Sequence, residues 1–480
     1  MSPHRLAPLA GLLLFLAACG NDPASPPPDG TGEGDPEEVR EYDAGSVPEG
    51  SGSDTADDVN GDGFADLLFL TDYDAENPDA DGLAARDELR RLMIVYGSED
   101  GPDPATRTVL PPKAVLAVSA SGRGGPQRPG TADLDGDGFT DIPVRADLGG
   151  DPRGGHAVVW GGPTGPDPDA APTPLAPPLD EDWLDSLLPA VAGDVDGDGA
   201  ADLVVVQESV TEAGGSLLRV LYGPFDRDGV PARTGRRPLD GWVGALISEP
   251  LAIDGGPTRL LIRWGDDGEQ PRNSLLRTGA EDPAAWEESD LRAGALAAFA
   301  DLDGGGGTDL ALADNGSRNN EPGFGTEAPE VDHRVNVYPG PSTAAPGDPV
   351  SGDLPVAGAE STGYSAHGLA ACDLDGDGRG ELAIGMNGLG VDLMHVEDGR
   401  IEVDSDARLV RHGPQGGPIG TDDETARAAR LFSCADYDAD GSDELVLVHG
   451  VGPYDNSPVR WWVTDGAQDE SSFDSADFTS

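Results

Sequence analysis

A pattern of polar and apolar residues returns along most of this chain and predicts its fold. In a clear copy, the acidic loop Asp194-Val-Asp196-Gly-Asp198-Gly-Ala-Ala-Asp202 is followed at once by the apolar run 203–206. A small-residue apolar stretch, 190–193, precedes the loop. Short apolar runs bounded by Asp and Gly are typical of β-strands and turns. Each copy is therefore predicted to be two strands joined by an acidic loop.

Five complete copies of the loop are present, together with one that is incomplete. The complete copies begin at Asp58, Asp133, Asp194, Asp373 and Asp436. The incomplete copy, Asp301-Leu-Asp303-Gly-Gly305-Gly-Gly-Thr-Asp309, lacks the middle carboxylate. A seventh unit is expected within 245–265, where Pro250–Ile253 and Leu260–Trp264 repeat the rhythm of two apolar runs around an Asp-Gly turn. Without the repeat, the same residues would be a simple hairpin.

A third apolar run often follows and ends in an aromatic residue and glycine, as in 92–97 and 217–223. Units of about 60 residues built from three or four short strands cannot bury a core alone, but units arranged radially can. Residues 53–467 are therefore predicted to form an all-β, seven-bladed β-propeller. Either residues 40–56 or the stretch after Trp462 would supply the strand that closes the ring.

The loop, the strand that leaves it and the aromatic–glycine run resemble FG-GAP (VCBS-type) repeats, which build the seven-bladed head of integrin α subunits and many bacterial surface proteins. The resemblance covers nearly all of the chain after residue 52. The Phe-Gly and Gly-Ala-Pro tripeptides of the family are mostly absent, so the chain resembles a divergent bacterial branch. The resemblance implies calcium in the loops and a partner bound away from them, at connections that include 72–91, 163–187 and 315–334.

The residue types within each loop favour calcium. Calcium takes six to eight hard oxygen ligands in irregular geometry. Loop positions 1, 3, 5 and 9 offer side-chain oxygens, position 7 offers a carbonyl, and the glycine at position 6 permits a sharp turn. The Glu that an EF-hand carries at position 12 is missing. The alternative is an Asx-rich turn that holds no ion.

About five calcium sites are predicted in the complete loops. Their ligands would be Asp58, Asn60, Asp62 and Asp66; Asp133, Asp135, Asp137 and Asp141; Asp194, Asp196, Asp198 and Asp202; Asp373, Asp375, Asp377 and Glu381; and Asp436, Asp438, Asp440 and Glu444. The loop of Asp301, Asp303 and Asp309 is a weaker sixth candidate, because Gly305 supplies no side chain. No ion is expected at the Asp254 unit.

The first residues read as an export signal. A basic start is followed by the apolar run 9–16, which is too short to span a bilayer. Leu16-Ala17-Ala18-Cys19 resembles the bacterial lipobox, so residues 1–18 would be removed and Cys19 lipidated. The alternative is an ordinary signal with a cysteine in its cleavage site. Residue 20 is not Asp, and by resemblance to the enteric sorting rule this favours the outer membrane of a bacterial envelope.

Two low-complexity segments are predicted to be disordered. Residues 19–52 are rich in Pro, Gly and acidic residues and would form a tether behind the lipid anchor. Residues 468–480 would form an acidic tail. The chain carries 90 Asp and Glu against 30 Lys and Arg, a net charge of −60. Such a charge repels nucleic acids and anionic bilayers, so nucleic acid is excluded as a partner and the membrane is reached only through the lipid.

Three side-chain features have two interpretations each. Cys372 and Cys434 precede neighbouring loops by one and two residues, and this offset favours two separate buried thiols over a disulfide. Trp461 and Trp462 are expected to pack between strands rather than form an exposed binding platform. The stretch 363–368 contains Ser365 and His367, but a Ser and a His two apart cannot form a catalytic dyad by themselves, so this stretch is predicted to be structural.

The sequence therefore predicts a surface-anchored lipoprotein whose calcium-stabilised propeller is a non-enzymatic platform for an extracellular protein or glycan. Nucleophile-elbow, zinc-protease, P-loop and dinucleotide-binding motifs are missing from the sequence. The alternative is a hydrolase or lyase that acts on polysaccharide in the propeller channel. A lectin without turnover lies between the two.

Overall fold

The computed structural model describes most of the chain after residue 44. The described residues are 45–71, 91–111, 130–149, 154–176, 183–186, 188–209, 215–250, 256–265, 271–316, 333–340, 345–354, 366–414, 424–450 and 459–478. Residues 39–480 belong to one compact unit. The predicted signal segment, Cys19 and most of the predicted tether lie outside the described residues. In the described part of the chain, no helix is long and apolar enough to cross a membrane.

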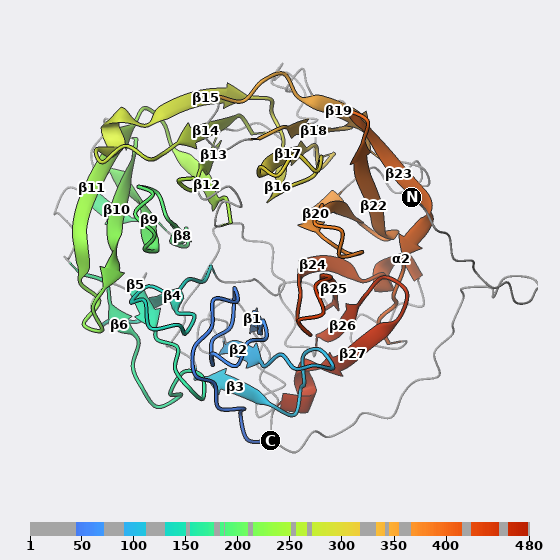
Figure 1. Ribbon diagram of the computed structural model, residues 1–480, viewed down its shortest axis with the longest axis horizontal. Coiled ribbons are helices and arrows are strands. Elements are labelled where there is room, and N and C mark those ends of the chain that lie inside the picture. Colours follow the sequence, from blue (N-terminus) through green and yellow to red (C-terminus); the bar gives the residue numbers. More distant parts are fainter. Residues whose placement is uncertain are drawn as a thin grey trace, which may run out of the picture. The chain divides into compact units, whose positions relative to one another are not determined.

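Seven antiparallel sheets follow one another along the chain around a common axis, so the chain is a seven-bladed β-propeller as predicted (Figure 1). Blade 1 contains β1 (Leu67–Thr71), β2 (Arg91–Val95) and β3 (Arg107–Leu110). Blade 2 contains β4 (Ile142–Ala146), β5 (Gly155–Val159) and β6 (Thr173–Pro174). Blade 3 contains β7 (Trp183–Asp185), β8 (Val191–Gly193), β9 (Asp202–Ser209), β10 (Ser216–Phe225) and β11 (Pro231–Leu239).

The remaining four blades each have four strands. Blade 4 contains β12 (Val243–Ser248), β13 (Leu260–Trp264), β14 (Asn273–Arg277) and β15 (Glu287–Leu291). Blade 5 contains β16 (Leu296–Ala300), β17 (Asp309–Ala313), β18 (Arg334–Tyr338) and β19 (Val350–Asp353). Blade 6 contains β20 (Ala366–Cys372), β21 (Glu381–Met386), β22 (Gly390–Glu397) and β23 (Arg400–Leu409). Blade 7 contains β24 (Arg430–Ala435), β25 (Glu444–His449), β26 (Arg460–Thr464) and β27 (Asp469–Asp474).

The strand order gives the propeller two distinct ends. In blades 4 to 7 the first strand lies nearest the axis and the fourth lies at the rim (Figure 1). Because neighbouring strands are antiparallel, the acidic loops between first and second strands all lie at one end, here called the loop end. Connections from second to third strands, and from one blade to the next, lie at the opposite end. Short helical pieces complete the fold: η1 (Pro283–Ala285), α2 (Glu424–Arg427) and η3 (Ser475–Phe478).

The hydrophobic core consists of seven clusters, and each is shared by two neighbouring blades. In β1, Leu67 and Phe69 pack against blade 7, whereas Leu68 and Leu70 pack against blade 2. Successive side chains of a strand point to opposite faces of its sheet. A strand buried on both faces must therefore be apolar at every position, which explains the continuous apolar runs after the acidic loops.

The seventh unit is confirmed as blade 4, with a shift of its first strand. That strand is β12 (Val243–Ser248), whereas residues 250–253 were predicted. Residues 251–255, including Asp254, lie outside the described residues. The strand was placed too late in the sequence because the Asp254-Gly pair resembles the acidic loops of the other units.

The ring closes by packing between blades 7 and 1. The Phe69 ring of β1 lies 4.1 Å from the Trp461 ring of β26, measured between centroids. Trp461 is fully buried in this interface, and Trp462 is buried between blades 6 and 7. The packing interpretation of both tryptophans is therefore confirmed.

The outer strand of blade 7 comes from the C-terminal stretch. β27 pairs with β26, and Phe473 and Phe478 are buried in the cluster shared with blade 1. The disordered tail expected at 468–480 is therefore wrong for residues 469–478. Their high Ser and Asp content conceals the two aromatic residues that hold this strand in place.

The preference for two separate thiols was also wrong. Cys372 at the end of β20 and Cys434 in β24 form a disulfide that joins the first strands of blades 6 and 7, with Cα atoms 6.0 Å apart. The offset argument fails because it holds for strands paired in one sheet. These two strands belong to different sheets that meet face to face, so the pleat of one does not determine which side chains of the other it meets.

Candidate functional site: the acidic loops

The first carboxylate of each loop is oriented by backbone N–H groups. In blade 3, Asp194 Oδ1 accepts from the Gly197 N–H at 2.7 Å, and Asp194 Oδ2 accepts from the Gly199 N–H at 2.9 Å. The equivalent bond from the glycine at position 6 recurs in the five other loops. The loops are therefore rigid turns closed around position 1, and the remaining carboxylates project from a fixed frame.

Two positions of the loop need a left-handed backbone. Position 6 is always glycine, with φ of +90° at Gly199. Position 4 also has positive φ, for example +78° at Gly197, a requirement that was not predicted from the sequence. Blade 7 has Ala439 at position 4 with φ of +60°, where a side chain is disfavoured.

The acid at position 9 is a structural clamp. Asp66 Oδ2 accepts from the Val59 N–H at 2.8 Å, and Asp66 Oδ1 accepts from the Gly97 N–H at 3.0 Å. Gly97 is the glycine of the aromatic–glycine motif. The sequence revealed this motif but not its structural role. The clamp recurs between Asp and Gly in three further blades: Asp141 with Gly161, Asp202 with Gly223, and Asp309 with Gly340.

The clamp glycine cannot carry a side chain. A Cβ atom at Gly97 would lie 2.4 Å from the Ala65 carbonyl oxygen. In blades 6 and 7, position 9 is Glu instead, and no aromatic–glycine pair follows. Glu381 accepts from the Leu374 N–H at 3.0 Å, and Glu444 accepts from the Tyr437 N–H at 2.8 Å. The loops are thus closed in two ways. Where position 9 is Asp, it also bonds to a later glycine, and where position 9 is Glu, no aromatic–glycine pair follows.

Positions 1, 3 and 9 come together as a potential cation site. In four loops, one oxygen from each of these three residues lies within 4.8 Å of the other two. These groups are Asp133, Asp135 and Asp141; Asp194, Asp196 and Asp202; Asp301, Asp303 and Asp309; and Asp373, Asp375 and Glu381. The incomplete blade 5 loop, rated as the weaker candidate, thus groups positions 1, 3 and 9 as three of the complete loops do.

In three loops, a buried side-chain oxygen without a hydrogen-bond partner is suited to bind a cation. Asn60 Oδ1, Asp135 Oδ1 and Asp301 Oδ1 are buried and have no hydrogen-bond partner in the structure. Buried oxygen atoms are normally paired, and hard oxygens are the ligands that calcium prefers. The residues of these loops therefore fit a bound calcium ion.

Position 5 lies outside the three-residue groups described above. The carboxylates at this position are Asp62, Asp137, Asp198, Asp377 and Asp440. Asp62 Oδ2 accepts from the Asn60 side chain at 2.8 Å in blade 1. In blade 7, Asp436 and Asp438 each accept from the backbone N–H of Asp440, at 3.1 Å and 3.0 Å. These loops are thus ordered by internal bonds around the predicted ligands.

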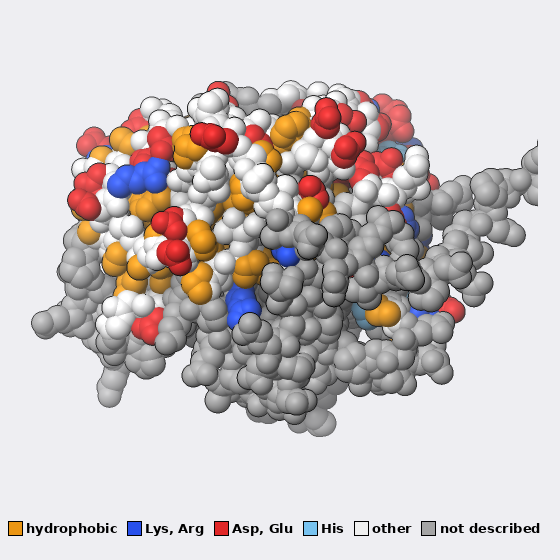
Figure 2. All heavy atoms as spheres, turned by 90° about the horizontal axis from the view of Figure 1, so that it is seen from below, with side chains coloured by type: hydrophobic (Ala, Val, Ile, Leu, Met, Phe, Trp, Pro, Cys, Tyr) orange, Lys and Arg blue, Asp and Glu red, His pale blue; other side chains and the backbone are white. Residues whose placement is uncertain are grey.

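The carboxylates at position 9 are hard to ionise in the metal-free fold. Burial raises the pKa of Asp141 and of Asp202 to about 7, despite two backbone hydrogen bonds that favour the charged form. Burial likewise raises the pKa of Glu444 to about 8, and neighbouring carboxylates add to the shift. On the face shown in Figure 2, the charged side chains of the described residues are mostly Asp and Glu, with few Lys and Arg. A cation would relieve this repulsion.

Three arginines pair with loop carboxylates, and none of these pairs was predicted. Arg227 forms ion pairs with Asp135 and Asp137 of blade 2. Arg233 pairs with Asp196 of blade 3, and Arg379 pairs with Asp377 within the blade 6 loop. Arg227 and Arg233 lie far along the chain from the carboxylates that they meet, so only the fold reveals these pairs.

In blade 4 an ion pair occupies the place of the acidic loop. Arg259 Nε and Nη2 donate to the two carboxylate oxygens of Glu249, each at 2.9 Å, and both side chains are buried. Arg259 Nη2 also donates to the Thr308 carbonyl of blade 5 at 2.6 Å. This blade therefore carries its own fixed positive charge where the other loops gather carboxylates.

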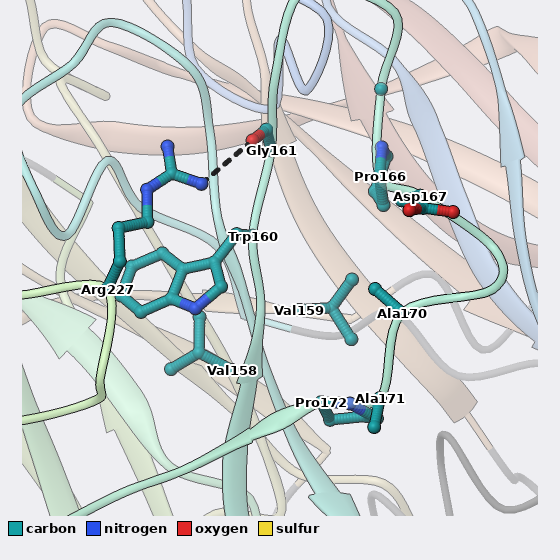
Figure 3. Close-up of a pocket in the computed structure, with 11 residues that line it drawn as sticks. Val158, Val159, Trp160, Gly161, Pro166, Asp167, Ala170, Ala171, Pro172 and Arg227 are labelled. Carbon is teal, nitrogen blue, oxygen red and sulfur yellow. Dashed lines mark hydrogen bonds between the residues drawn. The ribbon is translucent and has the colours of Figure 1, made fainter.

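A cavity of about 300 Å³ lies beside the blade 2 loop (Figure 3). Arg227 lies over the Trp160 ring, 5.0 Å from its centroid, and Arg227 Nη1 donates to the Gly161 carbonyl at 3.3 Å. Pro166, Asp167 and the stretch 170–172 form the other wall. The expectation that the insert 163–187 lies away from the loops is wrong for this part. The Gly162 N–H donates to the Val59 carbonyl of the blade 1 loop at 3.1 Å, because the connection from a third to a fourth strand returns at the loop end.

The other expected connections are only partly visible. Residues 72–90 and 317–332, as well as Ser365, lie outside the described residues. His367 accepts the Leu431 N–H at Nε2, at 3.1 Å, and so links blades 6 and 7. Burial, with a smaller effect of the Arg430 charge, lowers the pKa of His367 to about 4. His367 thus makes a structural contact between two blades.

Comparison with known proteins does not assign the chain to a family. No family model matches the chain, and no curated protein matches it. Among solved structures, an ACO/RPE65 chimera is 8% identical, with a TM-score of 0.38 over 80% of this chain and 84% of that chain. Apocarotenoid oxygenase from Synechocystis is 9% identical, with a TM-score of 0.39 over 90% and 94% of the two chains. Rhamnogalacturonan lyase YesW is 14% identical, with a TM-score of 0.23 over 78% of this chain and 62% of that chain. These likenesses concern the fold alone.

Proposed function

We propose that this chain is an exported lipoprotein, anchored through Cys19, whose calcium-stabilised propeller is a non-enzymatic platform for an extracellular protein or glycan. The observation that carries the proposal is the set of carboxylate groups at the loop end, which includes buried oxygen atoms without a hydrogen-bond partner. Similarity of the loops to FG-GAP repeats supports calcium as the ion. The anchor would place the protein at the bacterial envelope, with the outer membrane favoured.

Calcium would act on the fold rather than on a reaction. Each ion would be held by three side chains of one loop and would offset both the burial and the weaker carboxylate repulsion that raise the pKa of the position 9 acid. An ion that binds only the native state stabilises it by about 1.4 kcal/mol per site at about 10 times Kd. Extracellular calcium modules bind with a Kd of roughly 0.1–1 mM. Calcium outside the cell would therefore stabilise the blades that carry these loops.

The disulfide between Cys372 and Cys434 supports the export part of the proposal. Disulfides persist in oxidising compartments and are rare in the cytosol. The bond joins two neighbouring blades near the axis, so it would make the same platform more rigid.

Thermal unfolding of residues 40–480 tests the calcium part. We expect a higher unfolding temperature in millimolar calcium than in EGTA, reversed by added chelator and not reproduced by equal magnesium. An unchanged unfolding temperature would reduce the loops to metal-free turns. A glycan and protein array, combined with an assay for reducing ends released from polysaccharide, tests the platform. Binding without release supports it, and release of reducing ends would replace it by a polysaccharide hydrolase or lyase.

A further inference from the structure

Basic side chains gather in blade 7 at the end opposite the acidic loops. His449 is the last residue of β25, and Arg430 is the first residue of β24. Arg427 ends α2, and His412 is joined to Ala428 by an isolated β-bridge. The charges of Arg430, Arg427 and His412 all act on His449. The four side chains, here called the basic cluster, therefore lie within electrostatic range of one another.

The position of the cluster is fixed by backbone contacts. The Gly413 N–H donates to the Arg427 carbonyl at 2.8 Å, and Arg427 Nη1 donates to the Gly413 carbonyl at 2.9 Å. His449 packs directly on Gly413, because a Cβ atom there would lie 1.9 Å from the imidazole ring. The cluster is thus built on strand ends and a paired segment, which hold its basic groups in place.

Neither Arg430 nor His449 has a neutralising acid among the described residues. Burial lowers the pKa of Arg430, and no carboxylate of the described chain counters that shift. Burial, together with the three cationic neighbours, lowers the pKa of His449. Arg427 Nε is buried without a hydrogen-bond partner.

Three other arginines of blades 6 and 7 are paired with acids. Arg408 bonds to Asp392 at 2.7 Å, Arg411 bonds to Asp469 at 2.7 Å, and Arg460 bonds to Asp474 at 2.9 Å. In a chain with 90 acidic and 30 basic residues, a group of basic side chains without an acid is the exception. A largely buried charge without a partner is costly, and such charges normally meet a counter-charge.

We infer that the basic cluster of His412, Arg427, Arg430 and His449 binds a carboxylate of an acidic glycan. The guanidinium of Arg430 can donate two parallel hydrogen bonds to a carboxylate, and an imidazole can donate a third. The net charge of −60 acts against densely charged polymers such as nucleic acids. An acidic sugar chain brings at most one carboxylate per ring to the cluster, whereas double-stranded DNA carries about one charge per 1.7 Å of its axis. This inference rests on the proposed glycan-binding platform and assigns that platform its ligand class.

Calorimetric titration with trigalacturonate tests the inference, with its methyl ester as a matched sugar that lacks the carboxylates. We expect the acid to bind the full-length lipid-free protein, and the ester to bind more weakly by about tenfold or more. Arg430→Met and His449→Gln should each weaken binding of the acid by about tenfold. Arg400→Met, which removes an exposed arginine from the loop end of blade 6, should leave binding unchanged.

Unfolding temperatures of all three variants show whether the fold is intact. Because Arg430 has no acidic partner in the described chain, Arg430→Met should not lower the unfolding temperature. Equal binding of acid and ester, or full binding by Arg430→Met and His449→Gln, would overturn the inference but leave a glycan platform standing. Absence of binding by the unaltered protein would also overturn it. The calcium-dependent unfolding experiment, which needs no ligand, separately decides the calcium part of the proposed function.

Discussion

The Asp66 carboxylate accepts a hydrogen bond of 3.0 Å from the Gly97 N–H, and this bond ties the acidic loop of blade 1 to the residue pair that follows β2. The same bond between Asp and Gly occurs in blades 2, 3 and 5. Two sequence motifs that lie about 30 residues apart in blade 1 are therefore one structural unit. The acid at position 9 would stabilise the fold even if no ion were bound.

Replacing the clamp glycine should destabilise the fold. In Gly97→Ala the new Cβ atom would lie 2.4 Å from the Ala65 carbonyl oxygen and 2.8 Å from the Phe64 Cβ atom. We expect a loss of about 1–3 kcal/mol from overpacking, plus about 1 kcal/mol if the bond to Asp66 breaks. Chemical denaturation measures this difference. Gly347→Ala is the matched control, since nothing lies within 4 Å of its Cβ position, and an equal loss there would contradict the clamp.

Metal-free protein should lose stability as the pH rises. The pKa values of Asp141 and Asp202 are about 7 in the fold, and that of Glu444 is about 8, all above the values of an unfolded chain. The native state therefore binds more protons than the unfolded state, and unfolding free energy falls from about pH 4 to about pH 8. Unfolding temperatures in EGTA across this range measure the slope.

Calcium should oppose this pH dependence. The ion and the proton compete for the same carboxylates, so calcium adds more stability at the alkaline side of the range. A metal-free unfolding temperature that rises steadily from about pH 5 to about pH 8 would contradict the burial of these groups.

The sequence was sufficient for the blades but not for their contacts. Continuous apolar runs such as 203–206 mark strands buried on both faces, and the repeat spacing gives the blade number. The pairing of Cys372 with Cys434 depends on how two sheets face each other, which the pleat of a single strand does not determine. The strand that carries Phe473 was not predicted because its segment is mostly polar. Two aromatic residues, Phe473 and Phe478, do not form the alternating apolar pattern that indicates a strand.

The candidate site was predicted in part. Residue spacing gave loop positions 1, 3 and 9, whose oxygens the structure groups in four loops. The role of Gly97 was visible only as an unexplained motif. The pairs of Arg227 with Asp135 and Asp137 join residues that are distant in the chain. The basic cluster of blade 7 likewise consists of residues from separate segments. No local pattern encodes such contacts.

Blade 7 should become more stable when its loop regains glycine. Ala439 holds φ of +60° at position 4, where the blade 2, 3 and 6 loops have glycine with φ of +76°, +78° and +69°. The left-handed conformation costs a residue with a side chain about 1–2 kcal/mol, whereas glycine accepts it but loses more entropy on folding. We expect Ala439→Gly to add about 0.5–1 kcal/mol in chemical denaturation. Ala200→Gly, at a loop position without positive φ, should add nothing.

The buried ion pair of blade 4 should depend on both partners. Glu249→Gln leaves Arg259 charged and buried, and we expect a loss of about 3–5 kcal/mol in chemical denaturation. Glu249→Leu combined with Arg259→Met removes both charges and should recover most of that loss. Asp469→Asn at the more exposed pair with Arg411 is the comparison, with an expected change of about 1 kcal/mol or less. Equal effects at the two pairs would argue against a special role for the buried one.

The disulfide should stabilise the contact between blades 6 and 7. Its two cysteines are 62 residues apart, so the bond restricts a long loop of the unfolded chain. We expect Cys372→Ser to lower the unfolding free energy by about 2–4 kcal/mol, and dithiothreitol to have a similar effect on the unaltered protein. The double variant Cys372→Ser with Cys434→Ser should be insensitive to the reductant. Thiol titration of the unreduced, denatured chain provides the direct measurement. Reactive thiols at both positions in exported protein would show that the bond does not form, and the junction between these blades would then depend on packing around Trp462 and on the bond from Leu431 to His367.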